Sequence, residues 1–337
     1  MWRKIIIGTL IFLGVSALVL WYLAYKPVPD QITYGMSFNT MYARELGLDW
    51  QETYDAILDE LGVQHLRLAA HWPMVEPVND TYNFTELDYQ IEKAEAVQAS
   101  VILAVGRRLP RWPECHVPEW AKGLSQTEQQ DELRAYITAV VERYRASPAI
   151  VSWQVENEPY LRVFAFEHCG ELDENFLREE VALVRTLDPT RPILITDSGN
   201  LGTWSGAYQA GDIFGTSVYV YFWNPELGQF KTILPPWFYR VKESLVALRY
   251  GEKPTLLIEL SAEPWLLEPI TAVPLKVQYS RMNLDKFNEI LVYAAGTRYD
   301  KQYLWGAEWW YWLHKQGESA MWERGKELYT SSEATLP

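Results

Sequence analysis

The stretch WQVENEPY, residues 153–160, puts two glutamates and an asparagine at the end of an otherwise apolar run. Burying a carboxylate costs free energy unless the group is paired, hydrogen-bonded or used in chemistry. Glu259 stands in a similar setting, because it ends the apolar run TLLIE, and Glu263 follows four residues later. Two carboxyl groups can divide acid and nucleophile roles when their surroundings push their pKa values apart. Glu158 and Glu259 are therefore candidates for such a pair, provided that the fold brings them together.

The elements that must position these residues alternate between two kinds. Nearly continuous apolar runs are typical of parallel strands covered on both faces, and helical periodicity fills the segments between them. The expected strands are 32–38, 65–70, 100–106, 150–157, 192–198, 212–220, 254–260 and 302–307, and the expected helices are 49–62, 85–97, 125–144, 174–187, 235–251, 283–295 and 319–329. Eight such units over residues 32–330 predict a (β/α)8 TIM barrel, with a doubly wound open sheet as the alternative. The segment 199–211, between the fifth and sixth expected strands, fits this pattern least, because it is short and glycine-rich for a helix.

The first 25 residues differ from the rest. Residues 5–25 carry no charge, and about 20 apolar residues suffice to cross a bilayer as a helix. Arg3 and Lys4 precede this run, which predicts a cytoplasmic N-terminus. We therefore expect residues 1–25 to be a transmembrane signal-anchor in a lipid bilayer and 26–31 a short linker. The barrel is then membrane-anchored and extracytoplasmic; a cleaved signal peptide is the alternative, since 15–17 offers a small-residue site inside the run.

Charge and composition narrow the class of partner. The net charge of −14 argues against a nucleic-acid partner, because no basic footprint is visible. The 16 tryptophans and 21 tyrosines are many for 337 residues, and they predict either a large aromatic core or a cleft lined with rings.

Polar and aromatic residues gather where the expected strands end. In a barrel of this kind the active site lies at the C-terminal ends of the strands. The residues that reach this end are Arg67, His71, Trp72, Trp112, Glu114, Asn157, Glu158, Tyr219, Glu259, Trp305 and Glu308. The opposite ends carry mostly turn residues, as in SPA, DPTRP and GEKP, which places the chemistry at one end.

NEP at the end of the fourth strand and IEL at the end of the seventh resemble retaining glycoside hydrolases of the clan A (β/α)8 superfamily, cellulase-like family 5 and its relatives. The resemblance covers about residues 32–315, and it includes HLRLAA, LDPTRPI, DIFGTSVY and LWGAEWW. It implies that Glu158 is the acid/base and Glu259 the nucleophile of a double displacement. Retention of configuration needs two carboxyl groups about 5–5.5 Å apart, which agrees with glutamates on different strands.

The resemblance also implies roles for the neighbours of this pair. Asn157 would bind the sugar 2-hydroxyl, Arg67 would sit beside Glu259, Tyr219 would hydrogen-bond the same carboxylate, and Trp305 would stack under the sugar. His71, Trp72 and Trp112 are candidates to line the cleft, with ordinary packing as the alternative. Glu263 is the alternative nucleophile. Glu114 and Glu308 are expected to be solvated or salt-bridged, and alternation puts Glu156 on the same side as Glu158, with its role open.

Cys115 and Cys169 follow neighbouring strands, and an exported domain is in an oxidising setting, so we expect a disulfide. Zinc at these cysteines with His116 and His168 is disfavoured by the spacing. No metal or cofactor is expected. The predicted function is hydrolysis of a β-linked glycan or oligosaccharide; the alternative is a catalytically silent barrel that binds glycans at the cell surface. The sugar, its linkage, transfer instead of hydrolysis and the oligomeric state stay open.

Overall fold

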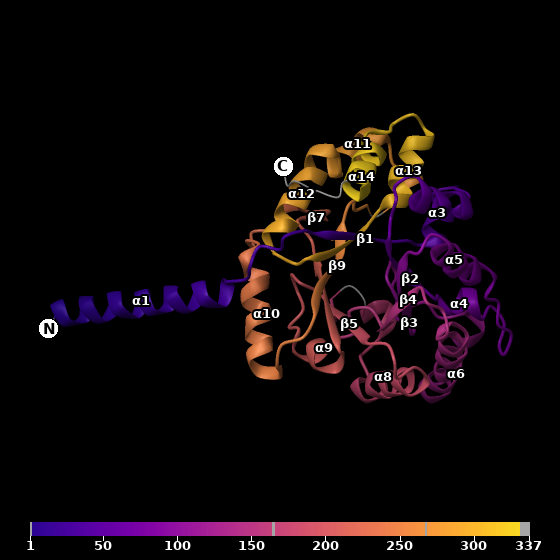
Figure 1. The fold of residues 1–337 in the computed structure, drawn as a ribbon, viewed down its shortest axis with the longest axis horizontal. Coiled ribbons are helices and arrows are strands. Elements are labelled where there is room, and N and C mark those ends of the chain that lie inside the picture. The colour runs from indigo at the N-terminus through magenta and orange to yellow at the C-terminus, as the bar shows by residue number, and fades with distance from the viewer. Residues whose placement is uncertain (1, 164–165, 267, 331–337) are drawn as a thin grey trace.

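The computed structural model describes residues 2–163, 166–266 and 268–330, and its main body is a closed barrel (Figure 1). Eight parallel strands follow one another around it in the order β1-β10-β9-β6-β5-β4-β3-β2. They are β1 Thr33–Ser37, β2 His65–Ala69, β3 Ser100–Val105, β4 Ile150–Val155, β5 Ile193–Asp197, β6 Ile213–Val218, β9 Thr255–Ser261 and β10 Lys301–Trp305. The predicted TIM barrel is confirmed, and the open-sheet alternative is excluded because β1 pairs with both β2 and β10.

Helices surround the barrel (Figure 1). Those after the first four strands are α2 Thr40–Glu45, α3 Trp50–Asp59, α4 Trp72–Val75, α5 Thr85–Ala96, α6 Gln126–Tyr144, α7 Phe166–Cys169 and α8 Glu174–Leu187. The others are α9 Ser205–Ala210, α10 Trp237–Tyr250, α11 Leu275–Arg281, α12 Leu284–Gly296, α13 Ala307–Lys315 and α14 Ala320–Thr330, with 3₁₀ turns at Glu119–Ala121 and Ile270–Ala272. The glycine-rich link 199–211 does contain a helix, but α9 has only six residues.

Local sequence explains where the main helices start. Ser125 accepts from the Glu128 backbone N–H, and the Glu128 side chain accepts from the Ser125 N–H, which forms a complete capping box at α6. Asp49 caps α3 by accepting from the backbone N–H groups of Gln51 and Glu52. The Glu52 side chain does not close a box there, because it accepts from Tyr311 on α13 and from Lys315.

The barrel interior is filled by side chains from several strands. Ile102, Leu194, Ile258 and Tyr303 pack against one another inside it. The Tyr303 ring fits because Gly35 faces it across the β1–β10 pair; a Cβ on Gly35 would lie 2.5 Å from that ring. This interior is therefore a packed core, and the open ends of the strands are the place for a site.

A two-stranded antiparallel hairpin interrupts the alternation after β6. It consists of β7 Tyr221–Asn224 and β8 Gly228–Lys231, and the sequence did not predict it. The expected sixth strand ran to residue 220, but the barrel strand β6 ends at Val218, so Tyr219 lies just past the strand end.

The first helix, α1 Trp2–Ala24, points away from the barrel (Figure 1). Its segment Ile5–Ala24 has a mean hydropathy of 2.3 and is not covered by the rest of the protein, so by length and composition it can cross a membrane. The side chains of Arg3 and Lys4, on which the predicted orientation depends, lie outside the described part of the chain.

Candidate active site

Arg67 connects the polar residues at the C-terminal end of the barrel. Its side chain leaves β2 and is almost wholly buried. Nη1 lies 2.8 Å from Oε1 of Glu259 on β9, Nη2 donates to Asn157 Oδ1 over 2.6 Å, and Nε donates to Gln154 Oε1 over 2.8 Å. A planar guanidinium can hold three acceptors in fixed directions, so Arg67 sets the positions of Glu259 and Asn157 relative to each other.

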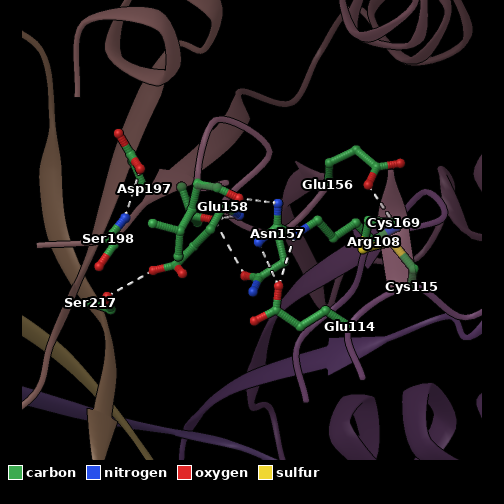
Figure 2. Close-up of polar contacts among 12 residues, drawn as sticks. Arg108, Glu114, Cys115, Glu156, Asn157, Glu158, Cys169, Asp197, Ser198 and Ser217 are labelled. Carbon is green, nitrogen blue, oxygen red and sulfur yellow. Dashed lines mark hydrogen bonds and ion pairs between the residues drawn. A yellow bond between two sulfur atoms is a disulfide. The ribbon is translucent and has the colours of Figure 1, made fainter. Parts of the chain in front are cut away.

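Glu158 is held by residues of β5 and β6. Its Oε1 accepts from Ser217 Oγ on β6 over 2.7 Å, and its backbone N–H donates to Thr196 Oγ1 on β5 over 2.8 Å (Figure 2). Ser217 is the register partner of Glu259 in the β6–β9 pair. Neighbouring strands lie about 4.8 Å apart, so the residue that holds Glu158 stands beside Glu259 in the sheet.

The electrostatics of Glu158 favour its neutral form. Burial raises the pKa of Glu158 well above its usual range, and the nearby Glu259 and Glu114 raise this pKa further. Glu259 instead faces the Arg67 guanidinium and accepts from Tyr219 Oη over 3.1 Å. Burial, together with Glu259, also keeps the pKa of Tyr219 well above its usual range, so Tyr219 is a donor to this carboxylate. The two glutamates thus occupy different electrostatic surroundings.

The side chain of Glu156 points away from Glu158, which corrects the expectation from alternation (Figure 2). The two-residue period ends with β4 at Val155, because Glu156 and Glu158 both adopt positive φ, 58° and 44°. Glu156 accepts from the backbone N–H groups of Arg107 and Arg108 over 2.7 and 2.6 Å. It also shares a hydrogen bond with the buried Glu180 of α8. Glu156 therefore ties the end of β4 to the loop after β3.

That loop brings a third carboxyl group to the site. Glu114 pairs with Arg108, whose Nε lies 2.8 Å from Oε2, as expected for a salt-bridged residue (Figure 2). Burial raises the pKa of Glu114, and the proximity of Glu259 adds to this effect. Arg108 also donates to the Leu161 carbonyl over 2.9 Å, so the pair joins the loops after β3 and β4.

Glu263, the alternative nucleophile, is engaged elsewhere. Its Oε1 lies 2.9 Å from Nη2 of Arg111, whose guanidinium stacks 3.1 Å from the centre of the Tyr42 ring. Arg111 lies in the loop after β3 and Glu263 lies just past the end of β9, so this ion pair connects two loops at the mouth of the barrel. Glu308, expected to be solvated or salt-bridged, is instead buried; it accepts from the Asn39 N–H over 2.6 Å, and burial raises its pKa to about 7.

The ring-bearing candidates differ in burial: Trp72 and His71 are buried, whereas Trp305 and Trp112 are at least partly exposed. Trp72 is wholly buried, where its ring packs on Trp120 and Tyr136 and its Nε1 donates to Glu76, which favours the alternative of ordinary packing. His71 is also buried, edge-on to His116. Trp305 lies 6.4 Å from the Tyr219 ring. Trp305 and His71 remain predicted substrate contacts. Trp112 is well exposed and packs against His168 at the rim.

Cys115 and Cys169 form a disulfide across the loops after β3 and β4, with their Cα atoms 5.3 Å apart. Both sulfur atoms are used, so neither is left as a zinc ligand. Within the described residues, Glu76, Asp80 and Glu132 bring carboxylate oxygens within 4.8 Å of one another, but both oxygens of Glu76 already accept hydrogen bonds, from Trp72 Nε1 and the Asp80 N–H.

The sequence interpretation did not single out several residues that hold this site: Gln154, Thr196, Ser217, Arg108 and Arg111. For Ser217 a signal existed, because it shares the parity of Tyr219 in DIFGTSVY. The assembled arrangement offers one buried carboxyl group favoured as an acid and one carboxylate held by a guanidinium and a phenol. Such a pair can donate a proton on one side of a bond and attack from the other.

Comparison with known proteins shows the family of this chain. Residues 47–247, more than half of the chain, match the glycoside hydrolase 42 family, described as beta-galactosidase. The chain is 25% identical over 172 residues to beta-galactosidase BgaA of Clostridium cellulovorans, a match that covers 46% of this chain and 25% of the relative. It is 30% identical over 120 residues to mannan endo-1,4-beta-mannosidase F of Aspergillus clavatus, a match that covers 34% of this chain and 26% of the relative. The matches thus span about a quarter of these curated relatives.

Solved structures show the same fold. A GH5_18 protein from Bifidobacterium longum subsp. longum superposes with a TM-score of 0.59 at 14% identity and covers 91% of this chain and 81% of its own. The cold-adapted beta-galactosidase of Rahnella sp. R3 superposes with a TM-score of 0.55 at 14% identity, and the match covers 84% of this chain and 51% of that protein. The described barrel is therefore shared with proteins of several glycoside hydrolase groups.

Proposed function

The chain belongs to the glycoside hydrolase 42 (beta-galactosidase) family, and from this premise we propose that it is a retaining glycoside hydrolase that works by double displacement. The observation that carries the proposal is the contrast between Glu158, buried beside Ser217 with a raised pKa, and Glu259, paired with Arg67. Retaining glycosidases need one neutral and one ionised carboxyl group on opposite sides of the scissile bond.

In the first step the Glu259 carboxylate attacks the anomeric carbon while Glu158 gives its proton to the departing glycosidic oxygen. The bond from the anomeric carbon to that oxygen breaks, and a glycosyl ester on Glu259 forms. In the second step Glu158 takes a proton from water, the water oxygen attacks the anomeric carbon, and the ester bond to Glu259 breaks. Glu158 thereby regains its proton and Glu259 its charge.

The neighbouring residues bind and orient. The contacts of the Asn157 side chain among the described residues use its Oδ1, so its amide nitrogen is placed to donate to the sugar 2-hydroxyl. Arg67 and Tyr219 each hold one of the two oxygens of Glu259. Trp305 provides a ring for stacking under the sugar. These roles need no group beyond side chains and water.

The substrate class is a β-linked glycan or oligosaccharide. Relatives named beta-galactosidase and mannan endo-1,4-beta-mannosidase make aryl β-galactosides and β-mannosides the first substrates to test. We further propose that α1 anchors the chain in a bilayer with the barrel on the extracytoplasmic side. The apolar span and the disulfide both support this location.

Two experiments test the chemistry. Glu158→Gln should slow hydrolysis of aryl glycosides with poor leaving groups far more than of those with good ones, because only the former need the proton. Equal losses on both would remove the acid role. A 2-fluoro sugar with a good leaving group should trap the covalent intermediate, and peptide mapping should find it on Glu259. A label on Glu263, or inversion at the anomeric centre, would overturn the assignment.

A further inference from the structure

The C-terminal end of α1 is fixed to one helix of the barrel. Arg240 Nε of α10 donates to the Ala24 carbonyl over 2.6 Å, and Ser244 Oγ donates to the Leu23 carbonyl over 2.7 Å. Just beyond α1, Lys26 pairs with Glu243 at 3.0 Å. These bonds satisfy carbonyl groups that a helix end leaves free, so they fix the point where α1 leaves the barrel. In Figure 1 α10 lies across the end of α1.

The side of α10 that meets α1 is mostly apolar, and most of its large side chains are exposed. We define the α10 face as Trp237, Val241, Leu245 and Leu248, with Ile233 just before the helix. These positions follow helical spacing and fall on the same side as Ser244, whereas Tyr239 and Val246 on the opposite side are buried against the barrel. Ile233 is 96% exposed and Leu248 is 73% exposed. A run of large apolar side chains in water marks a contact surface.

Basic groups surround this face in a chain whose net charge is −14. Arg240 and Arg249 lie on α10, and Lys26 and Arg298 stand beside the exit of α1, where Arg298 donates to the Lys26 carbonyl. Glu243 is neutralised by Lys26. Trp237 is exposed on the same side. Leucine and tryptophan on one side of a helix, with arginine at its edges, are typical of helices that lie in the interface of a bilayer.

We propose that the α10 face is a second membrane-contact surface, which lies on the outer surface of the same bilayer that α1 crosses. The inference rests on the proposed anchoring of α1 and is independent of the proposed catalysis. Because α1 ends on α10, the α10 face stands at the membrane surface as soon as α1 is inserted. Contact then needs no encounter from solution, since the tether raises the effective concentration of the face at the lipid.

The full chain in phosphatidylcholine vesicles tests this surface. Leu248→Cys, labelled with an environment-sensitive NBD fluorophore, should show blue-shifted emission and a loss of intensity when nitroxide lipids are included. A nitroxide near the headgroup should quench more than one at the chain end, because interfacial helices sit about 5–10 Å deep. The matched control is Val78→Cys, which is 60% exposed in the segment between α4 and α5. Both of these helices lie on the side of the barrel away from α1 (Figure 1). It should show neither change.

The outcomes separate the two proposals. Flotation with vesicles at alkaline pH reports the α1 anchor, and an unchanged circular dichroism spectrum of both labelled variants reports the fold of the barrel. If the chain floats but the two labels behave alike, the α10 face does not touch lipid and the inference is wrong. A blue shift at position 248 without quenching by nitroxide lipids would mean that protein covers the face, which also overturns it. Failure to float removes its premise.

Discussion

The hydrogen bond from Ser217 to Glu158 should set the upper pH limit of activity. Ser217 Oγ donates to Glu158 Oε1 over 2.7 Å, and this bond stabilises the ionised form of the carboxyl group. Ser217→Ala removes the donor, so the already raised pKa of Glu158 should rise further. Because Glu158 must be protonated for the first step, the basic limb of the pH profile should move to higher pH.

The size of this shift follows from the difference between two hydrogen bonds. A hydrogen bond to a charged group contributes about 1.5–3 kcal/mol and one between neutral groups about 0.5–1.5 kcal/mol. Loss of Ser217 Oγ therefore penalises the ionised form by about 1 kcal/mol more than the neutral form. Since one pKa unit corresponds to about 1.4 kcal/mol, we expect a shift of about one unit or slightly less.

The assay is kcat/KM against pH for an aryl glycoside with a poor leaving group, which reports the free enzyme. Ser152→Ala is the matched control, because it makes the same change at a buried position of β4 and should leave the profile unchanged. A basic limb that stays in place or moves to lower pH in Ser217→Ala would show that Glu158 is not the titrating acid.

Three further predictions concern stability and the membrane. Burial raises the pKa of Glu180 well above its ordinary value of 4.5, so between these two values the proton is bound in the folded chain and lost in the unfolded one. Stability should then fall as pH rises from 4.5 through the pKa of the folded state. Glu180→Gln should raise the free energy of unfolding near pH 8 by about 1–3 kcal/mol but change it little near pH 4. Equal effects at both pH values would contradict this. Replacing Cys115 and Cys169 by serine should lower stability by about 2–4 kcal/mol in chemical denaturation, and two free thiols in the unreduced, denatured parent would refute the bridge. Carbonate extraction should leave the full-length chain in the membrane pellet, whereas a shortened soluble form would identify residues 1–25 as a cleaved signal.

Sequence patterns predicted the barrel because its strands and helices repeat a simple alternation, with apolar runs for covered strands and capped amphipathic stretches for helices. They missed the β7–β8 hairpin, since YFWN and GQFK carry no barrel-strand pattern and are only partly buried. The side of Glu156 could not be predicted either. Alternation holds only while the backbone is extended, and Glu156 and Glu158, which both have positive φ, are held by contacts with the loop after β3 and with β5.

Strand-end position similarly marked Arg67, Glu158, Tyr219 and Glu259, but it could not tell Trp305 from Trp72. Both are tryptophans just past or at the end of a strand. Trp72 begins α4, and its ring packs on Trp120 and Tyr136, which are distant along the chain, so its burial is decided by tertiary packing and not by the local sequence.

The register of β6 against β9 has an evolutionary consequence. Ser217 is paired with Glu259 and holds Glu158, so the relative placement of the two carboxyl groups depends directly on the register of β6 against β9. Insertions, deletions and substitutions in mouth loops that contact neither glutamate, such as the β7–β8 hairpin, can therefore change the shape of the substrate-binding region without moving the reacting groups. New specificities can therefore evolve in small steps, each of which leaves the chemistry intact. Substitutions that change the register of β6 against β9 would be removed by selection.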